Sequence, residues 1–374
     1  MNERLHRLRP ILEEGAGGLR GVLLRTALWP FGLAMACALR LRRRAYRAGW
    51  LPSRRAGVPV LSIGNLTAGG TGKTPMAAYL ARYLLSQGRS PAVVARGYGA
   101  GGGAANDEER LLRQRVPGLR YEARPDRNAA IDRAVRAGAD VILLDDAFQR
   151  LQTHRDLDLV LIDATRPFGN GRVLPAGILR EPLSALRDAD LVVLTHTDQA
   201  EKESIERLKK RIARHAPQAP LLWSIHDPAR LSSLHDGAPL PLEKLRGLPV
   251  AALSTIAKPA HLAATLERLG ARVAMRIDLP DHYAYTIDDL RSACDVAVCA
   301  EAEVVLTTEK DAVKLEGLFA QFDASLPFFA LGVDLRITRG EETLHRVLGA
   351  VLHPQKAKES GSKSGSKGPP SQPS

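Results

Sequence analysis

The residues best suited to do chemistry lie in one glycine-rich stretch, which reads GNLTAGGTGKTP at positions 64–75. A short apolar run at 60–63 precedes this stretch, and Met76, Leu80 and Leu84 follow it at helical spacing. A strand, a glycine-rich loop ending in Lys-Thr and a helix are the parts of a phosphate-binding loop. The glycines allow backbone N–H groups to face phosphate oxygens, and the helix N-terminus adds positive potential.

This phosphate loop predicts an ATP site. We expect Lys73 to reach the β- and γ-phosphates and the Thr74 hydroxyl to hold Mg²⁺. Thr67 replaces the first glycine of the strict motif, and Ala68 replaces the second lysine found in certain ATPase loops. The alternative, a glycine-rich turn that binds nothing, fits the flanking strand and helix poorly. The predicted ATP-binding residues are Thr67, Ala68, Gly69, Gly70, Thr71, Gly72, Lys73 and Thr74.

A second group of candidate residues is acidic. Four apolar residues at 141–144 run directly into Asp145 and Asp146. An apolar strand that ends in acid is typical of the place where an ATPase strand meets Mg²⁺, directly or through water. Many parallel strands end in this way, but here the pattern follows a phosphate loop in the same chain. We therefore predict that Asp145 and Asp146 bind the metal together with Thr74.

Strands that alternate with helices must position these residues. Apolar strands are expected at 60–63, 91–95, 141–144, 157–163 and 190–195, and a helix is expected at 127–137. This alternation predicts a P-loop NTPase-like α/β fold with a doubly wound parallel sheet, whose ligands bind at the carboxyl ends of the strands. The Gly- and Pro-rich segment 168–182 is too irregular for a helix or strand, so we expect a functional loop there.

A second, smaller α/β domain is expected further along the chain. Its predicted strands are 249–254, 272–279, 304–308 and 328–331, and its predicted helices are 261–269 and 344–352. The end of the chain is rich in Ser, Gly, Lys and Pro, a composition typical of disorder. The predicted parts are 1–55 for a membrane-associating segment, 56–238 for the P-loop domain, 239–352 for the smaller domain and 353–374 for the disordered tail.

The net charge of +12 is unevenly distributed. Residues 1–55 hold twelve Arg and three Glu and so carry +9, and residues 356–374 carry +3. The other 300 residues sum to zero, which disfavours a nucleic-acid binder, because such proteins more often have a basic face on the folded domain. The number and spacing of Cys37, Cys294 and Cys299 suggest neither a disulfide framework nor a zinc site and predict a reducing compartment.

The N-terminal charge lies beside an apolar segment. Residues 26–39 carry no charge, and an arginine cluster follows at once: Arg40, Arg42, Arg43, Arg44 and Arg47. The segment is shorter than the roughly 20 residues of a spanning helix, and it lacks the cleavage site of a signal peptide. It could be an anchor held at an anionic membrane by its arginines, or a core helix with a solvated basic end. We favour the membrane, because the arginines immediately flank the apolar run.

Together these motifs resemble those of one family, the tetraacyldisaccharide 4'-kinases of lipid A biosynthesis. Beyond the phosphate loop, the resemblance rests on RGY at 96–98, DE at 107–108, DDAFQR at 145–150, FGNGRVLPAGILREP at 168–182, PDHY at 280–283 and TTEKDAVKL at 307–315. It implies a kinase at the cytoplasmic face of the inner membrane. The kinase would transfer the γ-phosphate of ATP to the 4'-hydroxyl of a tetraacyl glucosamine disaccharide 1-phosphate. The chain departs from the family pattern at Asn106, Ala147, Arg150 and 254–259, and in a short Gly/Ala link before Asp107.

The resemblance implies two residues for proton transfer. Asp107 would accept the proton of the sugar hydroxyl, and His282 would be its partner, since a neighbouring imidazole can orient and tune a base. Without the resemblance, Asp107 fits a helix N-cap and His282 an ordinary loop histidine.

The resemblance also implies residues near the phosphates. Lys73 and Arg180 would act in catalysis, and Glu181 would join the metal ligands. Gln149 and Arg127 are candidates for contact with the substrate or a phosphate. Without the resemblance, Arg180 and Glu181 would be read as a surface ion pair.

Two other classes of protein compete with a kinase. The first is a GTPase-like switch or transport ATPase, but Thr195-His196-Thr197-Asp198 lacks the Asn and Lys of a guanine-reading motif. The second is an adaptor that binds nucleotide without chemistry, which the presence of Lys73, Thr74 and the paired acids disfavours. The predicted cofactors are ATP and Mg²⁺. The predicted partners are the lipid-linked disaccharide and the membrane surface, with no nucleic acid and no obligate protein partner.

Overall fold

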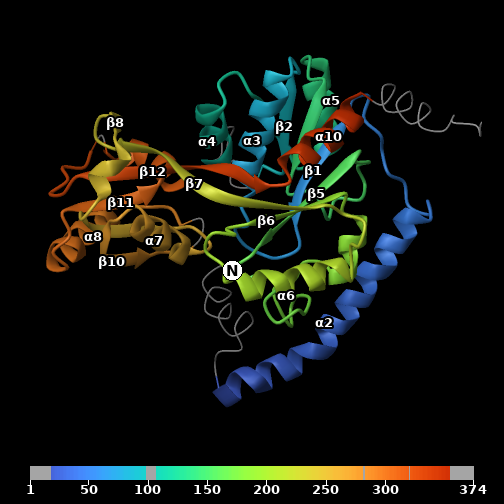
Figure 1. Cartoon of the computed structure of the whole chain (residues 1–374), viewed down its shortest axis with the longest axis horizontal. Helices are drawn as coiled ribbons and strands as arrows, with labels where there is room; N and C mark the ends of the chain where they lie inside the picture. Colours follow the sequence, from blue (N-terminus) through green and yellow to red (C-terminus); the bar gives the residue numbers. More distant parts are fainter. Residues whose placement is uncertain (1–17, 98–106, 281–282, 320, 354–374) are drawn as a thin grey trace, which may run out of the picture.

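One sheet of twelve strands runs through the molecule, with helices packed on its faces (Figure 1). The computed structural model describes residues 18–97, 107–280, 283–319 and 321–353. The strand order is β10-β9-β11-β12-β7-β6-β5-β1-β4-β2-β3, and β8 pairs with β7. Strand β7 pairs antiparallel with β12 and with β8, whereas the other pairs are parallel. The predicted α/β fold with a doubly wound, largely parallel sheet is confirmed.

We call the part built on the phosphate loop the first lobe. Its strands are β1 Val60–Asn65, β2 Pro91–Ala95, β3 Arg120–Ala123, β4 Val141–Asp145, β5 Leu157–Asp163, β6 Leu191–Thr195 and β7 Leu221–Ser233. Its helices are α3 Lys73–Ser86, α4 Asp107–Arg115, α5 Arg127–Arg136, η1 Leu183–Asp188 and α6 Lys202–Ala213. All residues of β1, β2, β4, β5 and β6 are buried, which explains why these strands read as unbroken apolar runs.

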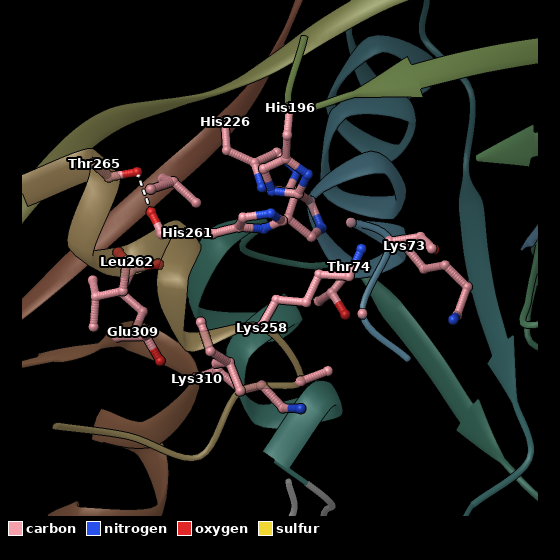
Figure 2. Close-up of a pocket in the computed structure, with 18 of the residues that line it drawn as sticks. Lys73, Thr74, His196, His226, Lys258, His261, Leu262, Thr265, Glu309 and Lys310 are labelled. Carbon is pink, nitrogen blue, oxygen red and sulfur yellow. Dashed lines mark hydrogen bonds between the residues drawn. The ribbon is translucent and has the colours of Figure 1, made fainter. Parts of the chain in front are cut away.

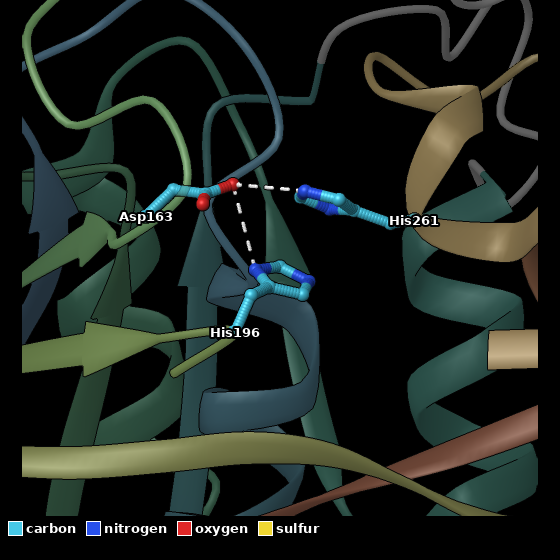
Figure 3. Close-up of side chains that lie close together, drawn as sticks. All are labelled: Asp163, His196 and His261. Atoms are coloured by element: carbon cyan, nitrogen blue, oxygen red, sulfur yellow. Dashed lines mark ion pairs between the residues drawn. The ribbon is translucent and has the colours of Figure 1, made fainter. Parts of the chain in front are cut away.

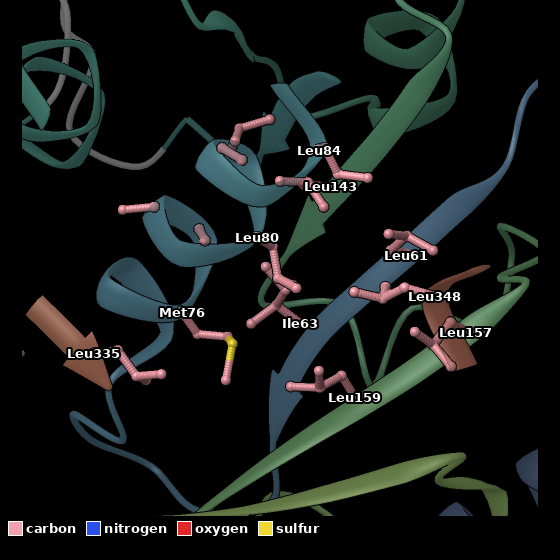
Figure 4. Close-up of a cluster of buried hydrophobic side chains, with 14 of the residues drawn as sticks. Leu61, Ile63, Met76, Leu80, Leu84, Leu143, Leu157, Leu159, Leu335 and Leu348 are labelled. Carbon is pink, nitrogen blue, oxygen red and sulfur yellow. The ribbon is translucent and has the colours of Figure 1, made fainter. Parts of the chain in front are cut away.

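Helix α3 fixes the phosphate loop to the sheet through a cluster of buried side chains (Figure 4). Met76, Leu80 and Leu84 lie on one face of α3 and are fully buried against Ile63 of β1 and Leu143 of β4. Burying a side chain of this size stabilises the fold by about 1.5–3 kcal/mol. The helical spacing in the sequence therefore marks the face that holds the loop in place.

The second lobe follows the long strand β7. It contains β8 Pro239–Leu240, η2 Leu242–Leu245, β9 Pro249–Ser254, α7 Pro259–Arg268, β10 Arg272–Asp278, α8 Ile287–Cys299, β11 Val304–Thr308 and α9 Glu309–Phe319. The chain then returns through β12 Phe328–Arg339 to α10 Glu341–Leu352. Strand β12 is longer than the predicted 328–331, because it pairs with β7 from Phe329 to Arg339.

The last two elements pack on the first lobe. Leu335 of β12 and Leu344 and Leu348 of α10 belong to the same buried cluster as Met76 (Figure 4). These residues fall in the predicted smaller domain, 239–352, but their apolar side chains are buried against the phosphate-loop lobe. The division into domains stays a prediction. Any domain boundary has to take into account that these side chains pack on the first lobe.

Helix α2, Gly18–Arg47, lies at the periphery of the molecule (Figure 1). It includes Pro30 and is longer than the predicted apolar segment 26–39. By length and composition alone, Gly21–Arg47 could cross a membrane, with a mean hydropathy of 1.6 and only 12% of the apolar window buried. Trp29 and Phe31 are exposed. The interpretation of this segment as a core helix is therefore wrong for the described residues.

Candidate active site

The phosphate loop connects the end of β1 to the start of α3. Asn65 Nδ2 donates a hydrogen bond of 2.8 Å to the carbonyl of Thr67, which turns the chain away from the strand. Gly72 has a φ of 86°, in the left-handed region that glycine tolerates without strain. A Cβ atom at Gly72 would lie 2.6 Å from Nε2 of His226, so a side chain there would also collide with β7. The loop is thus held by its glycines and by a histidine of a distant strand.

Three cationic side chains surround Asp146, which lies just after β4. Arg180 Nη1 donates to Oδ1 of Asp146 at 2.7 Å, and Lys73 Nζ lies 3.6 Å from the same oxygen. Arg127 Nη1 donates to the Asp146 carbonyl at 3.2 Å. Burial opposes ionisation of Asp146, but Lys73 and Arg180 outweigh it and lower its pKa to about 2. The structure therefore gathers Lys73, Asp146 and Arg180, which the sequence predicted for one site.

Asp145 ends β4 and is buried. Its Oδ1 atom is shielded from solvent and has no hydrogen-bond partner among the described residues. Burial, and then the charge of Glu108, raises the pKa of Asp145 to about 7, although Lys73 acts in the opposite direction. A buried carboxylate oxygen without a partner beside the phosphate loop fits a hard divalent cation such as Mg²⁺, which prefers oxygen ligands.

Glu181 lies outside this constellation. It is fully buried, and its Oε2 accepts a hydrogen bond of 3.0 Å from Nε of Arg43 in helix α2. Arg43 also donates to Oδ2 of Asp188 and to the carbonyl of Phe148. The structure therefore pairs the predicted metal ligand Glu181 with an arginine of α2, whereas its neighbour Arg180 points to Asp146.

The remaining predicted residues are placed as follows. Asp107 is the first residue of α4 and is half-buried. His282 lies outside the described residues, so the structure does not test whether the two meet. Arg127 is buried next to Asp146, and burial lowers the pKa of its guanidinium. Gln149 Nε2 donates to the Asn65 carbonyl at 2.7 Å, which supports the strand that leads into the loop.

A cavity of about 230 Å³ opens beside the phosphate loop, between the two lobes (Figure 2). The loop, Thr74 and Glu108 form its first-lobe wall, and Ile256, Lys258 and Lys310 come from the second lobe. The cavity lies where the strands of the first lobe end, as a doubly wound sheet predicts for its ligand.

Three histidines in this cavity were missed as site residues by the sequence analysis. His196 follows β6, His226 lies on β7 and His261 lies on α7. The ring centroids of His196 and His226 lie 4.1 Å apart, and those of His196 and His261 lie 3.9 Å apart. His196 belongs to the segment 195–198, whose sequence indicates only that a guanine-binding motif is absent there. No spacing pattern links it to residues 226 and 261.

The chain is similar to proteins of one family over nearly its whole length. The family model described as tetraacyldisaccharide-1-P 4'-kinase matches residues 24–353. A tetraacyldisaccharide 4'-kinase of Anaeromyxobacter sp. (strain K) is 44% identical over 356 residues, covering 90% of this chain and 92% of that protein. One of Geobacter sulfurreducens is 37% identical, covering 86% and 91%. The crystal structure of LpxK from Aquifex aeolicus in complex with ATP is 28% identical with a TM-score of 0.67, covering 88% and 99%.

Proposed function

The chain belongs to the tetraacyldisaccharide 4'-kinase family, and we propose roles in phosphate transfer for the residues that the structure gathers around its phosphate loop. The protein is an ATP-dependent kinase of lipid A biosynthesis that phosphorylates the 4'-hydroxyl of the lipid-linked disaccharide. The proposed roles rest on one observation. Lys73 and Arg180 both contact Oδ1 of Asp146 beside the phosphate loop.

ATP binds with its phosphates along residues 67–74. Phosphoryl transfer depends mainly on positioning and on neutralising charge at the transferred group. In the structure, Lys73 and Arg180 already converge on one anionic oxygen, that of Asp146. The same two cations are suited to hold and neutralise the transferred phosphoryl group. Arg127, buried behind Asp146, keeps the turn after β4 in place through the Asp146 carbonyl.

The Mg²⁺ that accompanies ATP would be held by Thr74, Asp145 and Asp146. The unpartnered Oδ1 atom of Asp145 supports this assignment. When bound, the ion neutralises charge on the phosphate oxygens. Glu181 stays a candidate for this ligand set through its Oε1 atom, which is also buried without a hydrogen-bond partner among the described residues. Its Oε2 atom is engaged by Arg43 and so holds α2 and the 168–182 loop together.

Asp107 acts as the general base for the sugar hydroxyl, with His282 as its partner. The position of Asp107 at the start of α4 supports this role, since the next residue, Glu108, lines the cavity beside the phosphate loop. Electrostatic influence of Glu108 on Asp145 places the start of α4 close to the acidic end of β4.

Helix α2 docks the enzyme on the cytoplasmic face of the inner membrane. Its exposed apolar residues include Leu23, Trp29 and Phe31, and its last turn carries Arg44 and Arg47. Apolar side chains enter the interface while arginines meet anionic head groups, each basic residue contributing about 1 kcal/mol near such a surface.

The decisive experiment is a lipid-kinase assay of the full-length protein. The protein is incubated with [γ-³²P]ATP and tetraacyldisaccharide 1-phosphate in detergent micelles, and the lipid and aqueous phases are counted separately. We expect label in the lipid, and we expect the Lys73→Ala variant to lose it. Release of inorganic phosphate without labelled lipid would instead indicate a nucleotide switch. Neither product would indicate an adaptor, and either result would refute the proposal.

A further inference from the structure

Asp163, His196 and His261 form a cluster of ligating side chains (Figure 3). Strand β5, which ends in Asp163, pairs with β1 on the side opposite to β4 and Asp145. Asp163 ends β5, His196 follows β6 and His261 lies on α7 of the second lobe. One ligand atom from each residue lies within 4.8 Å of the others. We propose that Asp163, His196 and His261 form a binding site for a divalent transition-metal ion of the Zn²⁺ class, separate from the Mg²⁺ site and shared by the two lobes.

The distances between the ligand atoms suit this ion. His196 Nδ1 lies 3.4 Å from Oδ2 of Asp163, and His261 Nε2 lies 3.7 Å from the same oxygen. With metal–ligand bonds of about 2.0–2.2 Å, two ligands of a tetrahedral ion are separated by roughly 3.4 Å. Both histidine nitrogens are therefore within a few tenths of an ångström of the separation from Asp163 Oδ2 that such an ion needs.

The types of donor atom also suit a metal. His196 is buried, and its Nδ1 makes no hydrogen bond with the described residues. A neutral imidazole has a ring nitrogen with a lone pair to give to a metal ion. Two imidazole nitrogens and one carboxylate oxygen are donors that Zn²⁺, Co²⁺ and Ni²⁺ accept, whereas Mg²⁺ prefers oxygen alone.

A second layer of contacts orients the ligands. The Thr165 backbone N–H and its hydroxyl both donate to Oδ1 of Asp163, at 2.9 and 2.7 Å, which leaves Oδ2 facing the histidines. The Thr165 hydroxyl oxygen also lies 3.1 Å from His261 Nε2. Because the hydroxyl hydrogen of Thr165 goes to Asp163, Nε2 of His261 donates its hydrogen to the Thr165 oxygen in this contact. Metal binding would require the other tautomer, with the hydrogen on Nδ1 and Nε2 turned to the ion. Such partners around metal ligands fix ring orientation and strengthen binding.

Lys258 is the competitor for this site. Its Nζ lies 2.6 Å from Oδ2 of Asp163, the oxygen that would bind the ion. An ammonium group and a divalent cation cannot both occupy that position, but the lysine side chain is long and its ammonium can swing into the adjoining cavity. Shortening the Lys258 side chain should therefore strengthen metal binding, although it removes a polar contact of Asp163.

The test is a Co²⁺ titration of untagged, full-length protein without nucleotide, in excess Mg²⁺, followed by visible absorption and by displacement with Zn²⁺. We expect one equivalent of Co²⁺ with the intense bands of a four- or five-coordinate ion. Loss of a partner that only orients a ligand costs 10–100-fold in affinity, so His261→Gln and His196→Gln should cost at least about 10-fold. Lys258→Ala should bind more tightly.

Matched variants separate this site from others. His353→Gln, which changes an exposed histidine at the end of α10, should bind Co²⁺ like the wild type. Asp145→Asn should also retain the bands, because that residue belongs to the Mg²⁺ site. Unchanged Co²⁺ affinity in His261→Gln, or no stoichiometric binding by the wild type, would overturn the proposal. If His261→Gln does not fold, weaker Co²⁺ binding by Lys258→Ala than by the wild type would overturn it equally. None of these readouts depends on kinase activity.

Discussion

Two acidic strand ends flank the phosphate strand β1, and they differ in the cations that face them. Strands β4 and β5 both pair with β1, so Asp146 and Asp163 lie on either side of the phosphate loop. Asp146 faces the ammonium of Lys73 and the guanidinium of Arg180. Asp163 faces Lys258 and two imidazoles. Ammonium and guanidinium groups suit phosphate, whereas imidazole nitrogens suit a metal ion once the ammonium of Lys258 has moved away from Asp163.

The two sides of β1 also differ in which parts of the chain supply their residues. Asp145, Asp146 and the lysine of the loop come from motifs that follow directly on strands, and the start of α4 lies beside them. The histidines of the β5 side come from both lobes, so their separation depends on how the lobes meet. We infer that the β4 side carries the transfer step.

The largest expected effect concerns proton transfer on the β4 side. Asp has an ordinary pKa of about 4, too low for an efficient base at pH 7, and a neighbouring imidazole could orient it or share the accepted proton. Asp107→Ala and His282→Ala should each lower turnover by ~10²–10⁴-fold while ATP still binds. Turnover is measured for both variants and the double variant, with ATP and acceptor saturating.

The double variant decides whether the two residues act as one unit. If they do, it should be little worse than the worse single variant. If the double variant loses turnover by the product of the two single losses, the two residues act independently. That result would refute the proposal that Asp107 and His282 work as a pair, even if both single variants are slow. ATP affinity, measured in parallel, controls for damage to the phosphate loop.

The next largest effect concerns the buried carboxylate behind the β4 side. Arg43→Gln leaves Glu181 buried without its ion-pair partner, a change that typically costs 3–5 kcal/mol in the free energy of unfolding. The double variant Arg43→Gln/Glu181→Gln removes both charges and should recover a large part of that loss. Arg54→Gln is the control, because the Arg54–Asp132 pair is exposed and contributes about 0–1 kcal/mol.

Urea unfolding of the four proteins measures these differences. Equal destabilisation by Arg43→Gln and Arg54→Gln would show that the buried contact with α2 does not support the fold. A double variant no more stable than Arg43→Gln would show that the hydrogen bonds to Phe148 and Asp188, rather than the charge of Glu181, carry the effect.

A smaller but still large effect is expected for Lys73. Lys73→Ala removes the ammonium that faces Asp146 and, in the complex, the transferred phosphoryl group. Charge stabilisation of this kind is worth several kcal/mol, so turnover should fall by at least ~100-fold. Lys202→Ala, an exposed lysine at the start of α6, should be like the wild type. Near-normal lipid phosphorylation by Lys73→Ala would remove the basis for assigning the chemistry to the β4 side.

The sequence is informative for one side of β1 and almost silent for the other, for a physical reason. Phosphate loops and acidic strand ends are contiguous in the chain, because a local turn places their backbone and side chains. Asp163 meets His196, Lys258 and His261 only after β6, β7 and the second lobe are assembled. The same reason explains why the contact between Arg43 and Glu181 was missed, since 138 positions separate the two residues.

The elements of the fold also divide into those that the sequence predicts and those that it does not. The buried strands of the first lobe match their predictions closely, because they are continuous apolar runs. Strand β7, Leu221–Ser233, was missed, since only part of it is buried and His226, Asp227 and Pro228 interrupt its apolar pattern. Sequence order likewise does not reveal that Leu335 of β12 and the buried face of α10 pack on the first lobe.

The smallest expected effect concerns the outer surface of α2, which the structure attaches to the β4 side through Arg43. Deleting residues 1–50 would strip the partner from Glu181 and confuse docking with folding, so substitutions on the exposed face are the sharper test. Trp29→Ser and Phe31→Ser each remove a large apolar side chain whose burial at a membrane is worth about 1.5–3 kcal/mol. Each should weaken cosedimentation with anionic vesicles by about 10-fold or more and leave ATP binding intact.

The control is Val298→Ser, which changes an exposed apolar residue on α8 of the other lobe and should have no such effect. Unchanged vesicle binding by the Trp29→Ser/Phe31→Ser double variant would separate α2 from the membrane and leave Arg43 as a purely structural link. Binding that is insensitive to salt would refute the contribution of the arginines.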